Sequence, residues 1–154
     1  NSFLTNEGNP FLYGYNWFGV GSDHYLTGYV ATWRYGSSMR PEQIESPATT
    51  IQFGDATHLV SGKITEYTYL SPPFSISGAS VEKLKTKKPT SSTLDSKVHF
   101  RHSKTANCAW IDGHVSQEKI SWSTTPDRAK LNIGNFGPQD NTYFDPWNDG
   151  IPLD

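Results

Sequence analysis

The sequence predicts an α+β domain dominated by antiparallel sheet, and three features of its composition lead to that fold class. Aromatic residues make up 14% of the chain although only 34% is hydrophobic, and large rings fit the pleated surface of a sheet better than a helix. The 13 Gly and 10 Pro favour many turns between short elements. The 154 residues suit a single domain, 1–154.

The first part of the chain is predicted to form short strands and one helical turn. Residues 13–17 and 29–33 are rich in Tyr and Trp and are separated by Gly-containing stretches, which is typical of strands joined by tight turns. A helical turn is expected at 41–44, where Ser38 is placed to act as its cap and Glu42 lies in the first turn.

Two further strands are predicted in the middle of the chain. Residues 49–53 alternate so that Ile51 and Phe53 should share one face, and the strand should end at Gly54 and Asp55. A second strand is expected at 64–70, followed by polar sequence that suits a surface insertion.

The clearest element is a β-hairpin centred on Asp112 and Gly113. An apolar run precedes this pair and a second run follows it, and a two-residue Asp-Gly loop matches the twist of paired strands. That pairing places Trp110 opposite Val115. We therefore expect Trp110, Val115 and Cys108 to share the face that packs on the core.

The last part of the chain is expected to hold one short helix and an ordered, aromatic tail. Thr125 is suited to cap a helix that has Pro126 in its first position. The Asp-rich tail at 132–154 contains four aromatic anchors, which should pack on the body. These anchors are Phe136, Tyr143, Phe144 and Trp147.

Charge and motifs exclude several classes of function. The net charge is −2 and the pI is near 6.2, which is unlike the basic footprint of a nucleic-acid binder. The basic cluster at 83–88 reads as a solvated loop. The single cysteine, Cys108, excludes an intrachain disulfide and reads as a small core residue. No nucleophile motif or cofactor loop is present, so we expect no enzymatic activity and no required cofactor.

The histidines allow three interpretations. Catalysis would pair His102 with a carboxylate such as Asp112 or Asp55. A metal site would group His99, His102 and His114. A structural hydrogen bond between His102 and Asp55 or Asp112 is the interpretation we favour, because a buried carboxylate needs such a partner.

Two other binding sites are conceivable. Oxygen ligands gather in the tail, and such ligands are what calcium prefers, although Asp and Asn also simply make turns. The calcium candidates are Asp140, Asn141, Asp145 and Asp149. Exposed aromatic residues at 11–35 would suit a carbohydrate-binding module, which is the alternative function, although half-buried strand residues produce the same pattern.

The segment from His102 to Val115 resembles the signature of a bacterial family of prepilin-type proteins, in which a His is followed by nine residues and an Asp-Gly pair. The remaining matches within it are Ala106, Asn107, Trp110, Ile111, His114 and Val115. The signature lies in the hairpin predicted at about 98–120. Further matches outside it are Tyr13 to Asn16, Pro47, and the strand from Thr50 to Phe53 that ends at Asp55. The signature and structural residues that the resemblance marks are His102, Asn107, Asp112, Gly113, His114 and Asp55.

The resemblance implies a pilin-like globular head and a function in assembly. Its members are similar to type IV pilins and type II secretion pseudopilins, which have a long apolar N-terminal helix before the head. We expect that helix to be absent from this chain and the isolated head to be monomeric. The full-length protein would be anchored in the inner membrane and would contact other pilin or pseudopilin subunits through the helix, on the periplasmic or extracellular side of the cell envelope.

Overall fold

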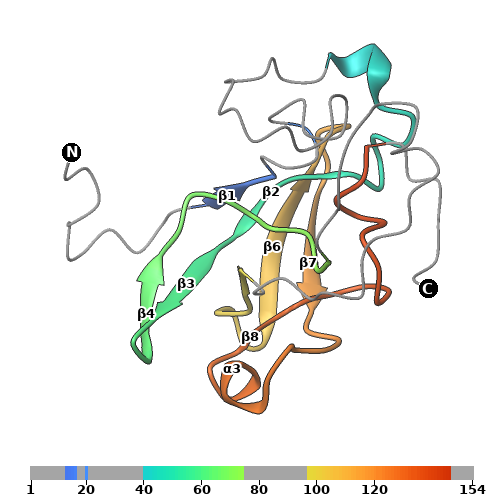
Figure 1. Ribbon diagram of the computed structural model, residues 1–154. Helices are drawn as coiled ribbons and strands as arrows, with labels where there is room; N and C mark the ends of the chain where they lie inside the picture. Colours follow the sequence, from blue (N-terminus) through green and yellow to red (C-terminus); the bar gives the residue numbers. More distant parts are fainter. Residues whose placement is uncertain (1–12, 17–19, 21–39, 75–96, 147–154) are drawn as a thin grey trace, which may run out of the picture.

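The computed structural model describes residues 13–16, 20, 40–74 and 97–146, and strands dominate this part of the chain (Figure 1). An antiparallel sheet has the strand order β1-β2-β6-β7. Its strands are β1 (Tyr13–Tyr15), β2 (Ile51–Asp55), β6 (Thr105–Trp110) and β7 (Val115–Lys119). Two smaller antiparallel ribbons pair β3 (Thr57–Val60) with β4 (Lys63–Glu66), and β5 (Val98–His99) with β8 (Ile133–Gly134).

Helix is limited, within the described ranges, to α3 (Pro126–Lys130) and the 3₁₀ turn η1 (Pro41–Gln43). The α+β prediction is therefore wrong, and the described residues form an all-β fold with one short α-helix. The aromatic residues and the frequent Gly and Pro that favour sheet also prevent long helices. None of the helices described is long and apolar enough to cross a membrane.

The two short helical elements begin close to where the sequence places them. Helix α3 has Thr125 as its N-cap, and the Thr125 hydroxyl accepts a hydrogen bond from the Arg128 N–H. In η1 the N-cap is Arg40, whose N–H donates to the Gln43 side chain over 2.8 Å. The expected cap, Ser38, lies outside the described residues, as does the strand expected at 29–33.

One core cluster fills the inner face of the large sheet. Phe100, Ile51 and Leu70 are fully buried, and burying a large apolar side chain contributes about 1.5–3 kcal/mol. Three of the four predicted tail anchors reach this cluster; the fourth, Trp147, lies outside the described residues. The three are Phe136, Phe144 and Tyr143.

A β-bulge in β2 places Ile51 and Phe53 on opposite faces of the sheet, although the sequence predicts them on one face. Ile51 pairs with Trp110 and Phe53 pairs with Ala109, so Gln52 is an extra residue in β2. Such a bulge interrupts the alternation of side chains. Ile51 is fully buried, whereas Phe53 is 39% exposed on the outer face. The strand ends at Asp55, as predicted.

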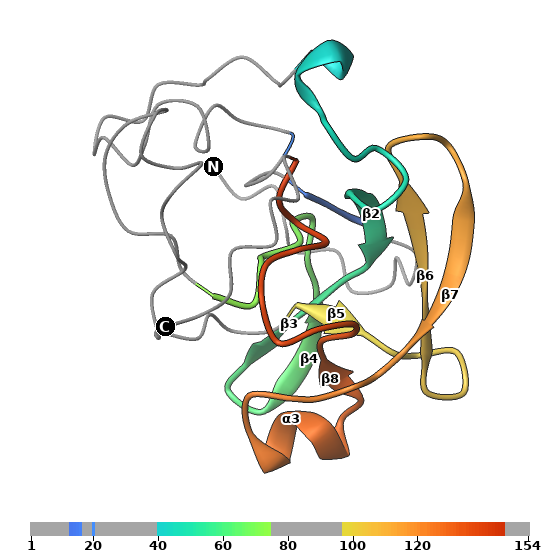
Figure 2. The same ribbon diagram turned by 90° about the vertical axis from the view of Figure 1, so that its right-hand side faces the viewer.

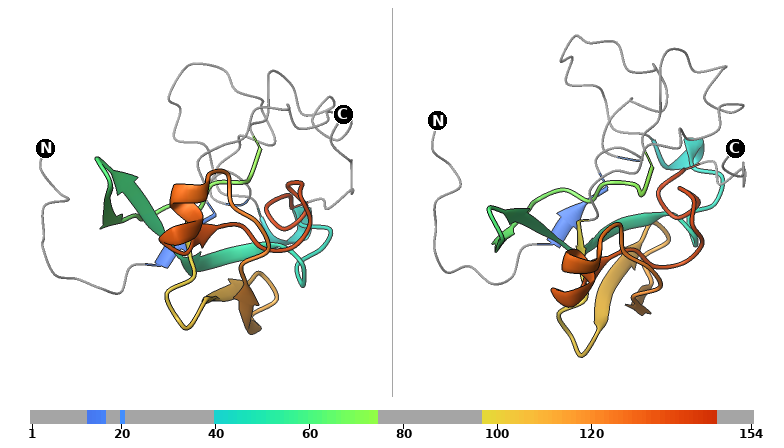
Figure 3. Two further views of the ribbon diagram at one scale, coloured as in Figure 1. Left: turned by 90° about the horizontal axis from the view of Figure 1, so that it is seen from below. Right: turned by 60° about the horizontal axis from the view of Figure 1, so that its bottom comes forward.

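The region predicted as one strand at 64–70 holds most of the second strand of a hairpin and then a separate bridge. Strand β4 ends at Glu66, and Tyr69 makes a single parallel bridge to Tyr15. The hairpin partner, β3, was not predicted. Its two-residue loop, Ser61 and Gly62, has φ values of 49° and 77°, and two positive φ values are those of a type I′ turn. Figure 3 shows this hairpin in green, extending to one side of the body.

The predicted hairpin at Asp112 and Gly113 is confirmed, but the prediction of a two-residue loop is wrong. The Trp110 N–H donates to the His114 carbonyl, and the Gly113 N–H donates to the Trp110 carbonyl, both over 3.0 Å. The loop therefore has three residues, and Gly113 takes the left-handed conformation with φ of 94°. This arrangement is a turn followed by a glycine bulge.

The extra loop residue shifts the pairing and changes which side chains face the core. Val115 lies opposite Ala109 and not opposite Trp110. A shift of one residue moves a side chain to the other face of a sheet. Val115 is consequently 69% exposed, so its predicted place in the core is wrong, whereas Trp110 and Cys108 are buried as expected.

Candidate functional site

The first site lies at the end of β2, where the buried carboxylate of Asp55 collects several donors. Asp55 is 4% exposed. Its Oδ2 accepts the Asn107 N–H of β6 over 2.8 Å and lies 3.2 Å from Nε2 of His102. Its Oδ1 lies 3.5 Å from Nε of Arg101. The expected structural bridge from His102 is therefore present, and its partner is Asp55 and not Asp112.

A tight turn holds His102 in place between β5 and β6. His102 and Thr105 exchange two backbone hydrogen bonds, and the two residues between them, Ser103 and Lys104, have φ values of 56° and 68°. Left-handed backbone at residues other than Gly costs about 1–2 kcal/mol each. The contacts around Asp55 offset this cost, because they fix the turn on the sheet.

The second site is the tip of the β6–β7 hairpin, where Asp112 and His114 form a pair. Asp112 Oδ1 accepts the His114 N–H over 3.1 Å and lies 2.6 Å from His114 Nδ1. These hydrogen bonds, from the His114 backbone first and then from its ring, hold the pKa of Asp112 below its ordinary value. The His114 ring also stacks on Trp110, with centroids 5.5 Å apart and an angle of 9°.

Trp110 connects this tip to the core and to β7. Its Nε1–H donates to the Ser116 hydroxyl over 2.7 Å, and that hydroxyl donates to Glu118 over 2.7 Å. Its ring meets Phe136 and Tyr143 edge-on at centroid distances of 6.3 and 5.3 Å. The residues of the signature therefore serve to build the hairpin and to tie it to β2.

The catalytic and metal interpretations of the histidines gain no geometric support. His102 and His114 have separate carboxylate partners, Asp55 and Asp112. Across residues 13–16, 20, 40–74 and 97–146, no group of three or more His, Cys, Asp or Glu could hold a metal ion. Cys108 is buried, and burial raises the pKa of its thiol well above the ordinary value, which leaves it a poor nucleophile.

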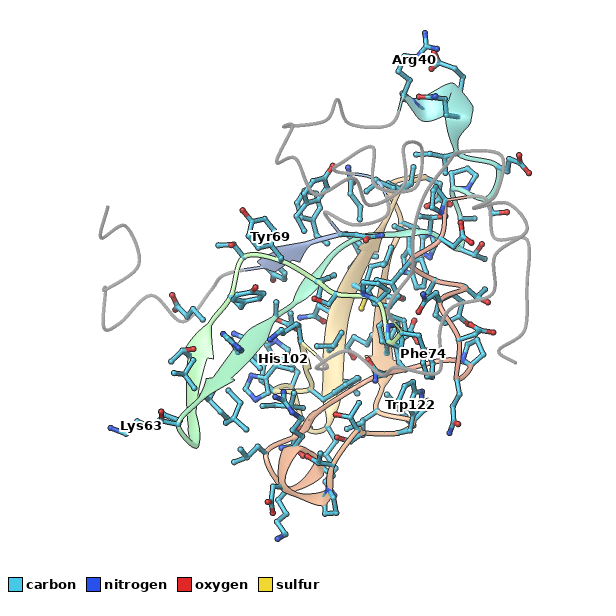
Figure 4. All side chains as sticks on the ribbon, in the orientation of Figure 1. Arg40, Lys63, Tyr69, Phe74, His102 and Trp122 are labelled. Atoms are coloured by element: carbon cyan, nitrogen blue, oxygen red, sulfur yellow. The ribbon has the colours of Figure 1, made fainter. Side chains whose placement is uncertain are left out.

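Two of the calcium candidates of the tail, Asp140 and Asn141, make structural hydrogen bonds with their side chains. Asp140 Oδ1 accepts the Thr142 N–H over 2.8 Å. The buried Asn141 amide pairs with the backbone of Phe74, donating to its carbonyl and accepting its N–H, both over 2.9 Å. Figure 4 shows the Phe74 ring beside Trp122, on which it stacks at a centroid distance of 5.8 Å. Asp149 lies outside the described residues, and calcium binding stays a prediction.

Sequence reasoning missed a row of side chains that crosses the outer face of the large sheet. Tyr69 bridges Tyr15, which pairs with Phe53, then Ala109, then Val115. Residues directly opposite one another point to the same side of a sheet. We call this set the outer row; Tyr69, Phe53 and Val115 are 44%, 39% and 69% exposed. The alternation of Tyr and other residues was the available signal, but the bulge and the shifted hairpin concealed the register.

Two neighbouring rings of the outer row, Tyr15 and Phe53, lie tilted against each other. The centroids of Tyr15 and Phe53 lie 5.1 Å apart with an angle of 33° between the rings. A sugar ring would need an aromatic face that is free to stack, and most of residues 11–35, on which the carbohydrate alternative depends, lie outside the described residues. Carbohydrate binding therefore stays a prediction.

Beside the row, a second aromatic group extends toward the β3–β4 hairpin. The Tyr67 ring meets Tyr69 edge-on at 5.9 Å and His58 at 4.9 Å, and Lys97 Nζ lies 4.9 Å from the centroid of Tyr67. Tyr67 therefore has neighbours on several sides. This group holds the segment that carries Tyr69 at one end of the outer row.

Comparison of the chain with protein-family models, with curated proteins and with solved structures finds no match.

Proposed function

We propose that this chain is a non-catalytic structural subunit of a type II secretion or type IV pilus-like filament at the bacterial cell envelope. The resemblance of residues 102–115 to the prepilin-type signature supports the assignment. So does the structural use of those residues: His102 and Asn107 contact the buried Asp55, while Asp112 and His114 close the hairpin tip.

The observation that carries this proposal is a contrast between two sets of residues. The signature residues make structural hydrogen bonds, whereas the outer row exposes apolar side chains. A catalytic signature would gather its polar side chains in one cleft, but here they form two separate structural sites. The outer row, in turn, exposes Tyr69, Phe53 and Val115 together, and exposed apolar patches mark surfaces that meet other proteins. A head that packs beside neighbouring heads needs both features.

The proposal places the full-length protein in the inner membrane before assembly, with this domain on the periplasmic or extracellular side. Partner subunits would be other pilins or pseudopilins, with no nucleic acid involved. Calcium is an optional ligand of the tail in this scheme and is not required for folding.

The test is fractionation of the source cell together with removal of its prepilin peptidase. We expect the full-length product of the gene to fractionate with the envelope and to change in mass when the peptidase is removed. Deletion of the gene should abolish a filament or secretion of a protein. Recovery of the intact product from the cytoplasm, with its mass unchanged in both strains, would overturn the proposal.

A further inference from the structure

Strand β7 forms one edge of the large sheet, and its outer side is open in the part of the chain that the structure describes. The strand order β1-β2-β6-β7 gives β7 a neighbour on one side only (Figure 2). An open edge presents unpaired backbone donors and acceptors to other chains. Among the described residues of β7 there is no Pro and no bulge that would block such pairing.

The hydrogen bonds of the hairpin show which backbone groups point outward. The Trp110 N–H donates to the His114 carbonyl, so the backbone of His114 faces β6, and the residues of an antiparallel strand that face a given neighbour alternate along the strand. Ser116 and Glu118 therefore direct their N–H and C=O groups toward β6. The groups that point away from the sheet belong to Val115, Gln117 and Lys119.

We propose that β7 pairs antiparallel with β7 of a second copy of this chain, with Gln117 opposite Gln117. In this register Val115 of each copy lies opposite Lys119 of the other, and every outward backbone group of the strand finds a partner. The two sheets become continuous, and the two outer rows lie on the same side of the joined sheet.

Repulsion between like charges disfavours one neighbouring register, and unpaired backbone groups disfavour the other. With Gln117 at the centre, Glu118 lies opposite Ser116, and the aliphatic stem of Lys119 covers Val115, which is 69% exposed in the single chain. Moving the centre to Glu118 would place two Glu118 carboxylates opposite each other, and like charges directly opposite are destabilising. Moving it to Ser116 leaves the outward groups of Lys119 unpaired.

The pairing is weak for one isolated pair of copies. An edge of five residues buries well under the ~1,000 Å² of a stable interface, so a dissociation constant of about 0.1–1 mM is expected. The isolated head thus remains monomeric at micromolar concentration. In its biological role the inference rests on the proposed function, since holding heads side by side raises their effective concentration to the millimolar range.

Amide exchange of the isolated chain tests the proposal directly. Raising the concentration from about 10 μM to about 1 mM should increase the average mass in sedimentation and should slow exchange at the Val115, Gln117 and Lys119 amides. The Ser116 and Glu118 amides already bond to β6 and should change little. A constant mass, or protection that spreads to Ser116 and Glu118 equally, would overturn the pairing.

Charge changes at one exposed position test the register. Val115→Lys faces Lys119 of the other copy and should weaken association about three- to tenfold, whereas Val115→Glu should strengthen it by a similar factor. The double variant Val115→Lys with Lys119→Glu should restore association. All three should melt like the parent, because Val115 is exposed. Association that ignores these changes would place the contact elsewhere and overturn the inference.

The two proposals fail in different ways. If the edge amides stay unprotected while the full-length protein fractionates with the envelope, only the β7 pairing is wrong. If the pairing is observed and the full-length protein is cytoplasmic, the filament proposal is wrong and the pairing stands.

Discussion

The β3–β4 hairpin and the β6–β7 hairpin both have Gly as the last residue of their loop. They differ in the length of the loop and in its contacts with the rest of the sheet. The β3–β4 hairpin has a two-residue loop at Ser61 and Gly62. The β6–β7 hairpin has a three-residue loop that ends at Gly113. The local sequence signal was stronger at Asp112 and Gly113, but the shorter loop formed elsewhere.

Contacts from outside the hairpin account for the difference. The Ile111 N–H donates to the Thr50 carbonyl over 3.0 Å, and the Asp112 N–H donates to the Pro47 carbonyl over 3.2 Å. These bonds extend the pairing of β2 onto the loop and hold it in the longer form. Among the described residues, no backbone hydrogen bond joins the β3–β4 tip to another segment, so its loop follows the local preference for a type I′ turn.

The largest expected effect comes from Asp55, which lies where β2 leads into β3 and also contacts the base of β6. Asp55→Ala should lower the free energy of unfolding by about 3 kcal/mol, because the Asn107 N–H and the His102 and Arg101 side chains lose their buried acceptor. Chemical denaturation measures the change. Asp55→Asn, which keeps an acceptor of the same shape, should lose clearly less. Equal stability of Asp55→Ala and the parent would show that the network does not connect the two hairpins.

A matched pair of glycine variants compares the two tips. Gly113→Ala and Gly62→Ala each put a Cβ on left-handed backbone, which costs about 1–2 kcal/mol. We expect Gly113→Ala to lose this amount in global unfolding, since its loop is bonded to β2. Gly62→Ala should mainly accelerate amide exchange within β3 and β4. If both variants lower the free energy of global unfolding equally, the β3–β4 hairpin unfolds together with the rest of the sheet, as β6–β7 does. The proposed difference between the two hairpins would then be wrong.

The smallest expected effect is a pH dependence of stability at the β6–β7 tip, which has a titrating Asp, and not at the β3–β4 tip. Because hydrogen bonds from His114 hold the pKa of Asp112 below its ordinary value of 3.8, the stabilisation is present above that value and is lost as the pH falls through the lower folded pKa. NMR titration of the Asp112 carboxyl should show this together with shifts of the His114 amide. Asp112→Asn should remove the acid-range shift, while amides near Ser61 should not respond. An Asp112 carboxyl whose pKa is at or above its ordinary value would contradict the stabilising hydrogen bonds from His114.

Elements with local signals were predictable, and their register was not. The cap and start of α3 at Thr125, the hairpin at Gly113 and the end of β2 at Asp55 follow from residues adjacent in sequence. The bulge at Gln52 and the loop length at Asp112 depend on partners distant in sequence. A one-residue error in either reverses the faces of the strand, which is why Phe53 and Val115 were misplaced.

The candidate sites divide in the same way. The pairing of His102 with a carboxylate was predictable, because a signature His and a carboxylate at a strand end imply a hydrogen bond. Which carboxylate it meets was not, since that depends on the turn at Ser103 and Lys104. The outer row could not be read from the sequence, because its members come from five segments brought together by the sheet register.

The position of β1 has a mechanical consequence. This short strand is bonded on one side to β2 and on the other to residues 68–70, with the Tyr15 N–H donating to the Thr68 carbonyl and the Leu70 N–H donating to the Tyr15 carbonyl. Gly14 lies so close to its neighbours that an added Cβ would fall 2.5 Å from the Cβ of Ala56. Tension applied at Tyr13 along the strand would load the bonds on both sides in shear at the same time, because they run across the strand. A domain pulled at this point would transmit the load into the sheet through two neighbouring segments at once.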